Sequence, residues 1–255
     1  MTVKEIYDQL DVRIPRSLSC DWDNDGLMCC PDAEKEVRRV LVALDVTAEM
    51  AEKAIREGYD LIVSHHPLVF RPIKALEPSV PVAGKAIRLL CAGISVMSFH
   101  TRLDAVQGGV NDTLAEALAL TDTVPFGNDG ETIGRIGNLK QEMTLDAFAE
   151  RVKQVTGAPC VTVSDGGVAV KRVAILGGSG SDDVGAARSA GADTYLSGEL
   201  AHHHLTDCPE WRMNLIAAGH FYTENPVCEV LRKLLLEIDP SLTVDVANSN
   251  RIRIV

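Results

Sequence analysis

Histidines and carboxylates recur at the ends of apolar runs in this chain. His100 follows the run ISVMSF and precedes Asp104 by four residues. His220 follows the run NLIAAG and precedes Glu224 by the same spacing. Imidazole nitrogen and carboxylate oxygen are donors that divalent transition metals accept. Because parallel α/β sheets present their ligand-binding groups at strand ends, the sequence predicts that several strand ends direct metal ligands toward one point.

An adjacent histidine pair, His65-His66, follows a third apolar run, LIVS. Consecutive strand residues point to opposite faces, but Pro67 stops the strand, so both rings can turn toward one site. The resulting donor set exceeds the three protein ligands typical of a catalytic zinc, and it suits two metals about 3.5–4 Å apart. Zinc, iron, manganese and nickel suit these donors almost equally. The predicted ligands are His65, His66, Asp104, His220 and Glu224.

Two further motifs have more than one interpretation. The run His202-His203-His204 is expected on a helix after Glu199, where it supplies surface histidines, a second metal site, or one substrate contact or proton carrier. The glycine-rich stretch GGSGSDD, which starts at Gly177, follows a strand and opens a helix. It could bind a phosphate through backbone N–H groups, or form only a tight turn. It lacks the lysine of a P-loop.

Two segments of the chain resemble each other at an offset of 133 residues, 38–66 and 171–199. Both predict a strand, a helix ended by glycine, and a second strand. The pair His65-His66 falls opposite Gly198-Glu199, and the two His-plus-carboxylate steps fall opposite each other at an offset of 120. The sequence therefore indicates an internal duplication. The identical pairs are Arg39 and Arg172, Val40 and Val173, Gly58 and Gly191, Asp60 and Asp193, and Ser64 and Ser197.

The expected elements alternate between strands and helices, which predicts mostly parallel sheets. A loop is expected over residues 20–29, and a polar, glycine-rich joint over 125–137. The expected helices cover residues 3–10, 48–57, 82–91, 109–118, 145–155 and 226–238. The expected strands cover residues 40–44, 61–64, 94–99, 161–163, 173–176, 194–196, 215–218, 242–247 and 252–255.

Composition narrows the class of protein. With 255 residues, 46% hydrophobic and 24% charged, the chain has the composition of a globular protein. No apolar run approaches the roughly 20 residues of a membrane helix, and no secretory signal is visible. The net charge of -11 disfavours a nucleic-acid partner. Seven cysteines without a C-x-x-C pair fit a reducing cytoplasm.

Six strings occur in an order that resembles the NGG-one-interacting factor three family, often labelled type 2 homologues of GTP cyclohydrolase I. The resemblance covers nearly the whole chain and implies a di-metal site on the five ligands named above. It also implies a homohexameric ring with the sites facing an inner cavity. A histidine of the family falls on His203, and SGEL here replaces a TGD-type string while keeping a carboxylate at Glu199. The strings are WDNDGL, SHHP, FHTRLD, GGVND, GGSGSD and AAGHFYTE.

The predicted fold is α/β, with two intertwined α/β domains related by duplication, each a mostly parallel or mixed sheet flanked by helices. The first domain is expected over residues 1–125, joined by the C-terminal segment 226–255. The second is expected over 126–225 and carries His220 and Glu224.

The leading hypothesis for function is a di-metal-dependent hydrolase of a small molecule. Such a site could open the ring of a nucleotide, as in a GTP cyclohydrolase, or cleave a phosphoester. Glu199 or His203 would carry the proton as catalytic residues. The alternatives are a non-catalytic metal-binding scaffold or regulatory protein, and a metal-handling protein that uses the histidine run.

Overall fold

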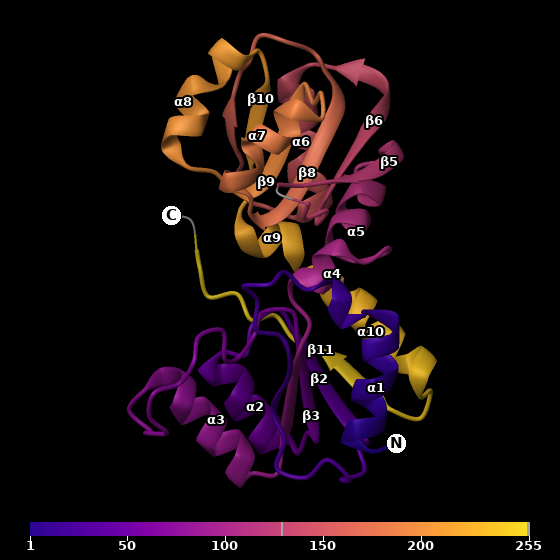
Figure 1. Cartoon of the computed structure of the whole chain (residues 1–255), viewed down its shortest axis with the longest axis vertical. Helices are drawn as coiled ribbons and strands as arrows, with labels where there is room; N and C mark the ends of the chain where they lie inside the picture. Colours follow the sequence, from indigo (N-terminus) through magenta and orange to yellow (C-terminus); the bar gives the residue numbers. More distant parts are fainter. Residues whose placement is uncertain (129, 254–255) are drawn as a thin grey trace. The chain divides into compact units, whose positions relative to one another are not determined.

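The computed structural model describes residues 1–128 and 130–253 and contains two compact α/β units (Figure 1). Unit 1 comprises Met1–Val106 and Val227–Ile252, and unit 2 comprises Gln107–Pro226 and, of the described residues, also Arg253. Unit 2 is therefore inserted into the sequence of unit 1. Each unit has one sheet flanked by helices, which confirms the α/β fold class predicted from the sequence.

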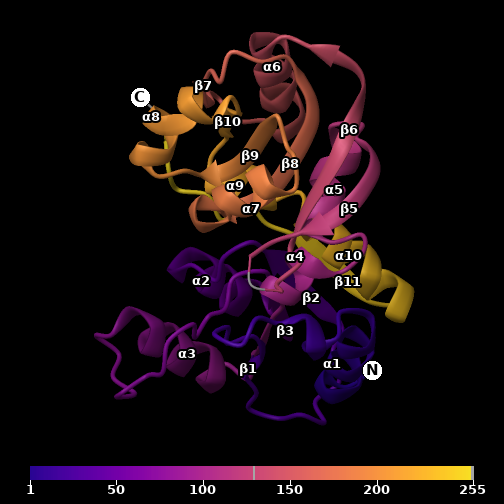
Figure 2. The ribbon, with the colours of Figure 1, turned by 45° about the horizontal axis from the view of Figure 1, so that its top comes forward.

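The sheet of unit 1 has four parallel strands and one antiparallel edge strand. Its order is β1 (Gly26–Cys29), β4 (Ser95–Ser98), β3 (Leu61–Ser64), β2 (Arg39–Ala43) and β11 (Thr243–Val246). Two helix pairs cover opposite faces of this sheet, as Figure 1 and Figure 2 show. One pair is α2 (Ala48–Glu57) with α3 (Pro81–Cys91), and the other is α1 (Val3–Arg13) with α10 (Val227–Ile238).

Local sequence signals set the limits of these helices. The hydroxyl of Thr2 caps α1 by accepting from Glu5 N, and the Glu5 side chain accepts from Thr2 N, which forms a capping box. Thr47 caps α2, and Gly58 ends it with φ +69°, a left-handed conformation that glycine adopts without a Cβ penalty. These signals explain why the helix limits follow the sequence-based expectations closely.

Unit 2 has a mixed six-stranded sheet. Its order is β5 (Thr121–Phe126), β6 (Gly134–Met143), β8 (Val170–Ser179), β9 (Thr194–Glu199), β10 (Asn214–Ala217) and β7 (Thr162–Ser164). Successive residues of β8 enter two different cores, as expected for a strand buried on both faces. Val173 and Ile175 pack with α5 (Val110–Ala117) and α6 (Leu145–Thr156), whereas Ala174 and Leu176 pack with α7 (Val184–Ser189) and α8 (His202–Trp211).

The internal repeat is visible in the hydrogen bonds of the two sheets. Val40 pairs with Leu61 across β2 and β3, and residues at an offset of 133 pair in the same way across β8 and β9. In both units an aspartate at the start of the second strand accepts from the backbone of the first strand. Asp60 Oδ2 accepts from Arg38 N and Arg39 N at 2.9 and 3.0 Å. Asp193 Oδ2 accepts from Lys171 N and Arg172 N at 3.0 and 2.7 Å.

Two sequence-based expectations are wrong because strand pairing outweighs the local turn signals. The expected loop over residues 20–29 ends in β1, which becomes a strand only by antiparallel pairing with β4. The expected joint over 125–137 contributes to the β5–β6 pair, which is part of the sheet of unit 2.

Three more expectations concern the domain boundary, the last strand and membrane-spanning helices. The expected boundary at residues 125/126 would place α5 and β5 in the first domain, whereas their contacts place them in unit 2. Of the strand expected over 252–255, residues 252–253 are irregular and 254–255 lie outside the described residues. Among the helices described for this chain, none combines the length and apolar character needed to span a bilayer.

Candidate metal centre

Three histidines of unit 1 have the same hydrogen-bonding arrangement. Nδ1 of His65 donates to the carbonyl oxygen of Phe99 at 2.9 Å. Nδ1 of His66 lies 2.7 Å from a carboxylate oxygen of Asp45. Because an acceptor at Nδ1 keeps the proton on that nitrogen, a neutral ring can bind a cation only through Nε2.

His100 repeats this arrangement with a different acceptor. Its Nδ1 lies 2.8 Å from Asp23 Oδ1. The candidate ligand atoms of His65, His66 and His100 all lie within 4.8 Å of one another. The predicted ligand set did not include His100, although its position before a helical turn was the signal that could have identified it.

The chain leaves β3 in a way that brings the adjacent histidines together. Ser64 is the last residue of the strand, and its hydroxyl donates to the carbonyl oxygen of His66 at 2.8 Å. His66 N donates to Leu44 O at 2.9 Å, beyond the end of β2. The rings of His65 and His66 are 5.0 Å apart and tilted by 42°, so they do not point to opposite faces of the sheet. The expectation that both rings turn the same way at the strand end fits this geometry.

Asp104 lies next to His65, as its predicted role requires. It is part of the short helix α4 (Thr101–Ala105), which begins directly after His100. Oδ1 of Asp104 lies 3.7 Å from Nε2 of His65, and Asp104 is only 8% exposed. A carboxylate and an imidazole in a buried setting form a donor pair suited to a divalent cation.

Arg102 fixes the helix that carries Asp104. Its buried guanidinium donates to Asp25 Oδ2 at 3.0 Å, to Asp11 Oδ1 at 2.5 Å and to the carbonyl of Ile14 at 3.0 Å. Burial by itself lowers the pKa of Arg102, but the charge of Asp25 and the hydrogen bond to Asp11 raise it above its ordinary value. The local sequence does not predict this role of Arg102, because its partners lie 77 to 91 residues away.

Asp23 holds His100 and the first turn of α4 together. Its carboxylate accepts from His100 Nδ1, from Thr101 N at 3.0 Å and from the Thr101 hydroxyl at 2.7 Å. Burial raises the pKa of Asp23, but these hydrogen bonds and the His100 charge outweigh it and lower the pKa to about 2. The carboxylate is therefore ionised at neutral pH.

In unit 2, His220 lies between two carboxylates. Its Nδ1 lies 3.2 Å from Glu199 Oε1, and its Nε2 lies 3.0 Å from Glu224 Oε2. Both residues of the predicted step belong to the short helix α9 (His220–Glu224), and Glu224 is 4% exposed. With Nδ1 held by Glu199, the Nε2 of a neutral imidazole has only a lone pair to direct at Glu224, so a cation bound by both atoms would suit this pair of donors.

Glycines allow α9 to approach the strands of unit 2. A Cβ at Gly178 would lie 2.0 Å from Glu224 Oε1, and the φ of Gly178 is +68°. A Cβ at Gly198 would lie 2.5 Å from the carbonyl oxygen of Gly178 and 2.8 Å from the Cα of His220. These two glycines therefore leave the space that the His220–Glu224 pair occupies.

The same close packing accounts for the glycine-rich stretch after β8. Gly177 N donates to Asn111 Oδ1 at 2.8 Å, and Gly178 N donates to the Thr223 hydroxyl at 3.0 Å. Gly180 N donates to a serine hydroxyl of β9. Three N–H groups of the stretch are thus engaged by side chains of unit 2, so the tight-turn interpretation fits the structure.

The histidine run lies at the start of α8, as expected. His202 and His203 are exposed, whereas His204 is partly buried 5.9 Å from the ring of Trp211. Burial lowers the pKa of His204. Across residues 1–128 and 130–253, no group of three closely spaced metal donors includes the run.

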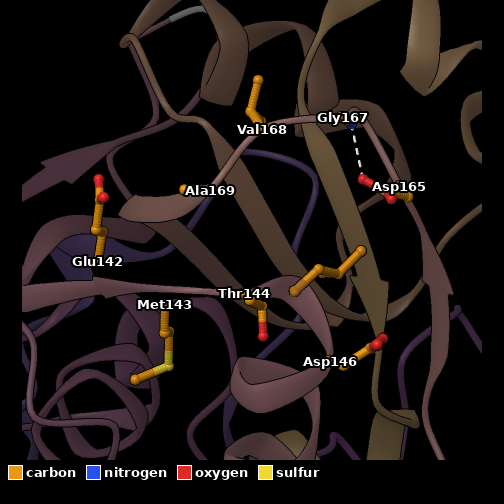
Figure 3. A pocket seen from close by; sticks show the side chains of 9 residues that line it. Glu142, Met143, Thr144, Asp146, Asp165, Gly167, Val168 and Ala169 are labelled. Atoms are coloured by element: carbon orange, nitrogen blue, oxygen red, sulfur yellow. Dashed lines mark hydrogen bonds between the residues drawn. The ribbon is translucent and has the colours of Figure 1, made fainter.

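A separate pocket of about 500 Å³ lies in unit 2, near the start of α6 (Figure 3). Asp165 accepts there from Gly167 N at 2.7 Å, as the dashed line shows. The lining also carries the carboxylates of Glu142 and Asp146. None of its nine lining residues is a predicted site residue.

Comparison with known proteins identifies the family. A model of the family described as Duf34/NIF3 (NGG1p interacting factor 3) matches residues 1–253. The chain belongs to the Duf34/NIF3 family. This confirms the resemblance found from the ordered sequence strings.

Relatives of this Duf34/NIF3 chain carry two kinds of name. A "GTP cyclohydrolase 1 type 2 homolog" of Clostridium perfringens is 34% identical over 233 residues, which are 89% of this chain and 88% of the relative. A "Protein NIF3 homolog" of Schizosaccharomyces pombe is 34% identical over 222 residues, which are 81% and 79% of the two chains.

Solved structures have the same fold. Staphylococcus aureus protein SA1388 has a TM-score of 0.88 and 26% identity, covering 100% of this chain and 99% of that one. Reduced HcgD from Methanocaldococcus jannaschii has a TM-score of 0.83 and 28% identity, covering 96% and 97% of the two chains. The two-sheet α/β architecture is thus that of NIF3-related proteins.

Proposed function

We propose that this Duf34/NIF3 chain is a metal-dependent hydrolase that acts on a small molecule with two bound divalent metal ions. The observation that supports the proposal is the pair of Nδ1 hydrogen bonds of the adjacent rings of His65 and His66, which leave Nε2 as the atom through which each neutral ring could bind a cation. The ions are zinc, iron, manganese or nickel, since these donors suit each of them. The proposed ligands are those expected from the sequence: His65, His66, Asp104, His220 and Glu224.

The chemistry of the proposal divides between the metals and the protein. When bound, such a metal pair supplies hydroxide at neutral pH and polarises an oxygen or imine of the substrate. Asp45 and the Phe99 carbonyl keep the rings of His66 and His65 in their ligand orientation. Glu199 holds His220 at Nδ1, which fits a role in orienting that ring. We also propose that Glu199 or the exposed His203 moves a proton to or from the substrate.

The substrate and assembly are further parts of the proposal. The names of relatives such as "GTP cyclohydrolase 1 type 2 homolog" favour ring opening of a nucleotide as the first reaction to test, with phosphoester hydrolysis as the second. We propose that the protein works as a homohexamer in the cytoplasm, as the family resemblance implies. Light scattering coupled to size-exclusion chromatography would measure the oligomer.

The deciding experiment combines metal analysis with a substrate screen. The native protein would be assayed for bound metal and then tested against nucleotides and phosphoesters with that metal supplied. We expect two tightly bound metals per chain, and turnover that Glu224→Gln reduces at least 100-fold. The matched control is Glu229→Gln, which makes the same change at an exposed position of α10. Two tightly bound metals without turnover would favour a regulatory scaffold, and loose, variable loading would favour a metal carrier.

A further inference from the structure

Two large aromatic side chains are exposed in unit 1. Trp22 is 57% exposed, and Phe70 is 42% exposed. They come from separate loops, yet their ring centroids are 6.2 Å apart with an interplanar angle of 77°. Exposed aromatic rings that group together are a common mark of binding sites, because burying them against a partner is favourable.

Both rings lie next to the histidines of the candidate metal centre. The ring of His100 is 6.2 Å from that of Trp22 and 5.9 Å from that of Phe70, in edge-on arrangements. The ligand atom of His100 is in turn within 4.8 Å of those of His65 and His66. A planar molecule on the two aromatic rings would therefore lie next to His100, which adjoins His65 and His66.

The loops that carry the two aromatic residues are fixed by hydrogen bonds. Trp22 precedes Asp23, whose buried carboxylate is bound by His100 and Thr101. Asn24 Nδ2 donates to the carbonyl oxygen of Val69, which links the Trp22 loop to the residue before Phe70. The exposed rings are thus held by their neighbours, and such preorganisation lowers the entropic cost of binding.

We propose that Trp22 and Phe70 form a platform that binds the planar heteroaromatic ring of a small-molecule substrate beside the metal centre. Two rings at a steep angle can hold a third by stacking on one and touching the edge of the other. Such stacking accepts many ring types, because each has a π-face. The overall acidity of the chain favours a small molecule over a nucleic-acid strand. This inference rests on the proposed function for the identity of the ligand as substrate.

Tryptophan fluorescence provides a direct test. The chain has two tryptophans, so Trp211→Phe leaves Trp22 as the single reporter. We would titrate the metal-loaded W211F protein with guanosine, and with ribose as the control that lacks the heteroaromatic ring. Saturable quenching by guanosine without a response to ribose is expected. No saturable response to guanosine, or an equal response to ribose, would overturn the proposal.

Substitutions test whether guanosine binding depends on the two aromatic rings or only on the structure of the loops that carry them. Equilibrium dialysis of guanosine should show binding that is about 5- to 100-fold weaker in Trp22→Leu and in Phe70→Leu, because both changes keep apolar bulk but remove the ring. Trp22→Phe should retain most of the affinity. The matched control is Leu76→Ala, an exposed apolar side chain between β3 and α3, which should bind guanosine as the native protein does.

The remaining readouts keep this inference distinct from the proposed function. If metal loading and turnover are intact while the leucine variants bind guanosine normally, the platform is wrong and the hydrolase proposal stands. If guanosine binding depends on both rings but no turnover is found, the platform proposal is supported and the hydrolase proposal is not. If the leucine variants change the oligomeric state and leave guanosine binding unchanged, the two rings belong to a protein interface and the proposal is wrong.

A short oligonucleotide of single-stranded DNA would be titrated in parallel with the nucleoside. We expect it to bind no more tightly than guanosine. Tighter, strongly salt-dependent binding of the oligonucleotide would contradict a small-molecule platform.

Discussion

Unit 1 and unit 2 share a backbone arrangement but supply different donors at equivalent positions. After the first strand of the repeat, unit 1 has Asp45 where unit 2 has Gly178. The carboxylate of Asp45 binds His66 directly, whereas Gly178 leaves space for the carboxylate of Glu224. Each unit therefore has a carboxylate beside a strand end that contacts a histidine, but Asp45 follows the first strand of the repeat in unit 1 and Glu199 ends the second strand in unit 2.

The second strand of the repeat differs in the same manner. Unit 1 ends it with His65 and His66, and unit 2 has Gly198 and Glu199 at the corresponding positions. The imidazole of His65 is buried beside Asp104, while even a Cβ at Gly198 would collide with backbone atoms. The strand–helix–strand unit of the repeat can therefore carry either imidazole or carboxylate donors at the end of its second strand. Which donor it carries depends on how closely the helix that follows packs against that strand.

The largest expected effect concerns this packing. Gly198→Ala should destabilise the protein by about 3 kcal/mol or more, because its Cβ would meet the carbonyl oxygen of Gly178 and the Cα of His220, which are backbone atoms that cannot rotate away. Urea unfolding would measure the loss. The control is Gly185→Ala in α7, where no atom lies within 4 Å and a helix favours alanine. Equal stability of the two variants would contradict the close-packing explanation.

The next effect tests the partners of the histidines. Asp45→Asn and Glu199→Gln should each weaken metal binding about 10- to 100-fold, because each removes the charged acceptor at Nδ1 of one histidine. Competition with a chelator would measure the affinity. Glu210→Gln, which makes the same change at an exposed position of α8, is the control. A fall in only one of the two variants would limit metal binding to that unit.

A smaller effect concerns the aspartate shared by both repeats. Asp60→Asn and Asp193→Asn should each cost about 1–3 kcal/mol, because each carboxylate accepts two backbone N–H groups. Urea unfolding of both variants tests whether the equivalent positions are equivalent in energy. A clearly larger loss of stability in one variant would show that the free energy contributed by the aspartate depends on its surroundings in that unit, and not on its position in the repeat.

The pH dependence of stability gives a second test of the role of Asp60. Burial raises its pKa, but hydrogen bonds from Arg38, Lys35 and Arg39 outweigh this and lower the pKa below its ordinary 3.8. A carboxylate with a lowered folded-state pKa stabilises the protein above its unfolded-state pKa, and this stabilisation is lost as pH falls through the folded-state pKa. The native protein should therefore lose more stability than Asp60→Asn when the pH falls below about 4. Parallel losses would contradict the role of the ionised carboxylate.

The smallest effect is at a helix start. Thr47 caps α2 through its hydroxyl, whereas α7, at the equivalent place in unit 2, has no side-chain cap. Thr47→Ala should cost about 1 kcal/mol, and Thr47→Ser much less, because serine keeps the hydroxyl. Thermal unfolding would measure both. An equal loss in the two variants would show that the methyl group, and not the cap, is responsible.

The sequence by itself determined the elements whose signals are local. Helices such as α2 and α6 begin at a capping threonine and end at a left-handed glycine, and both limits are short-range properties. The duplication was also readable, because the registers of β2–β3 and β8–β9 follow the offset of 133 residues. The i,i+4 spacing of each His-plus-carboxylate step is compatible with the helical turns α4 and α9 that the structure has there, since an i,i+4 pair shares one helix face.

Only the tertiary structure decided which groups surround the donors. Asp45, Asp23 and Arg102 act on partners 21 to 91 residues away, and no local pattern encodes contacts over such separations. The strands β1, β5 and β6 were missed because a short or glycine-rich strand gains its stability from the neighbour with which it pairs. Donor types are a property of residues, whereas their orientation depends on hydrogen bonds that exist only once the sheets have formed.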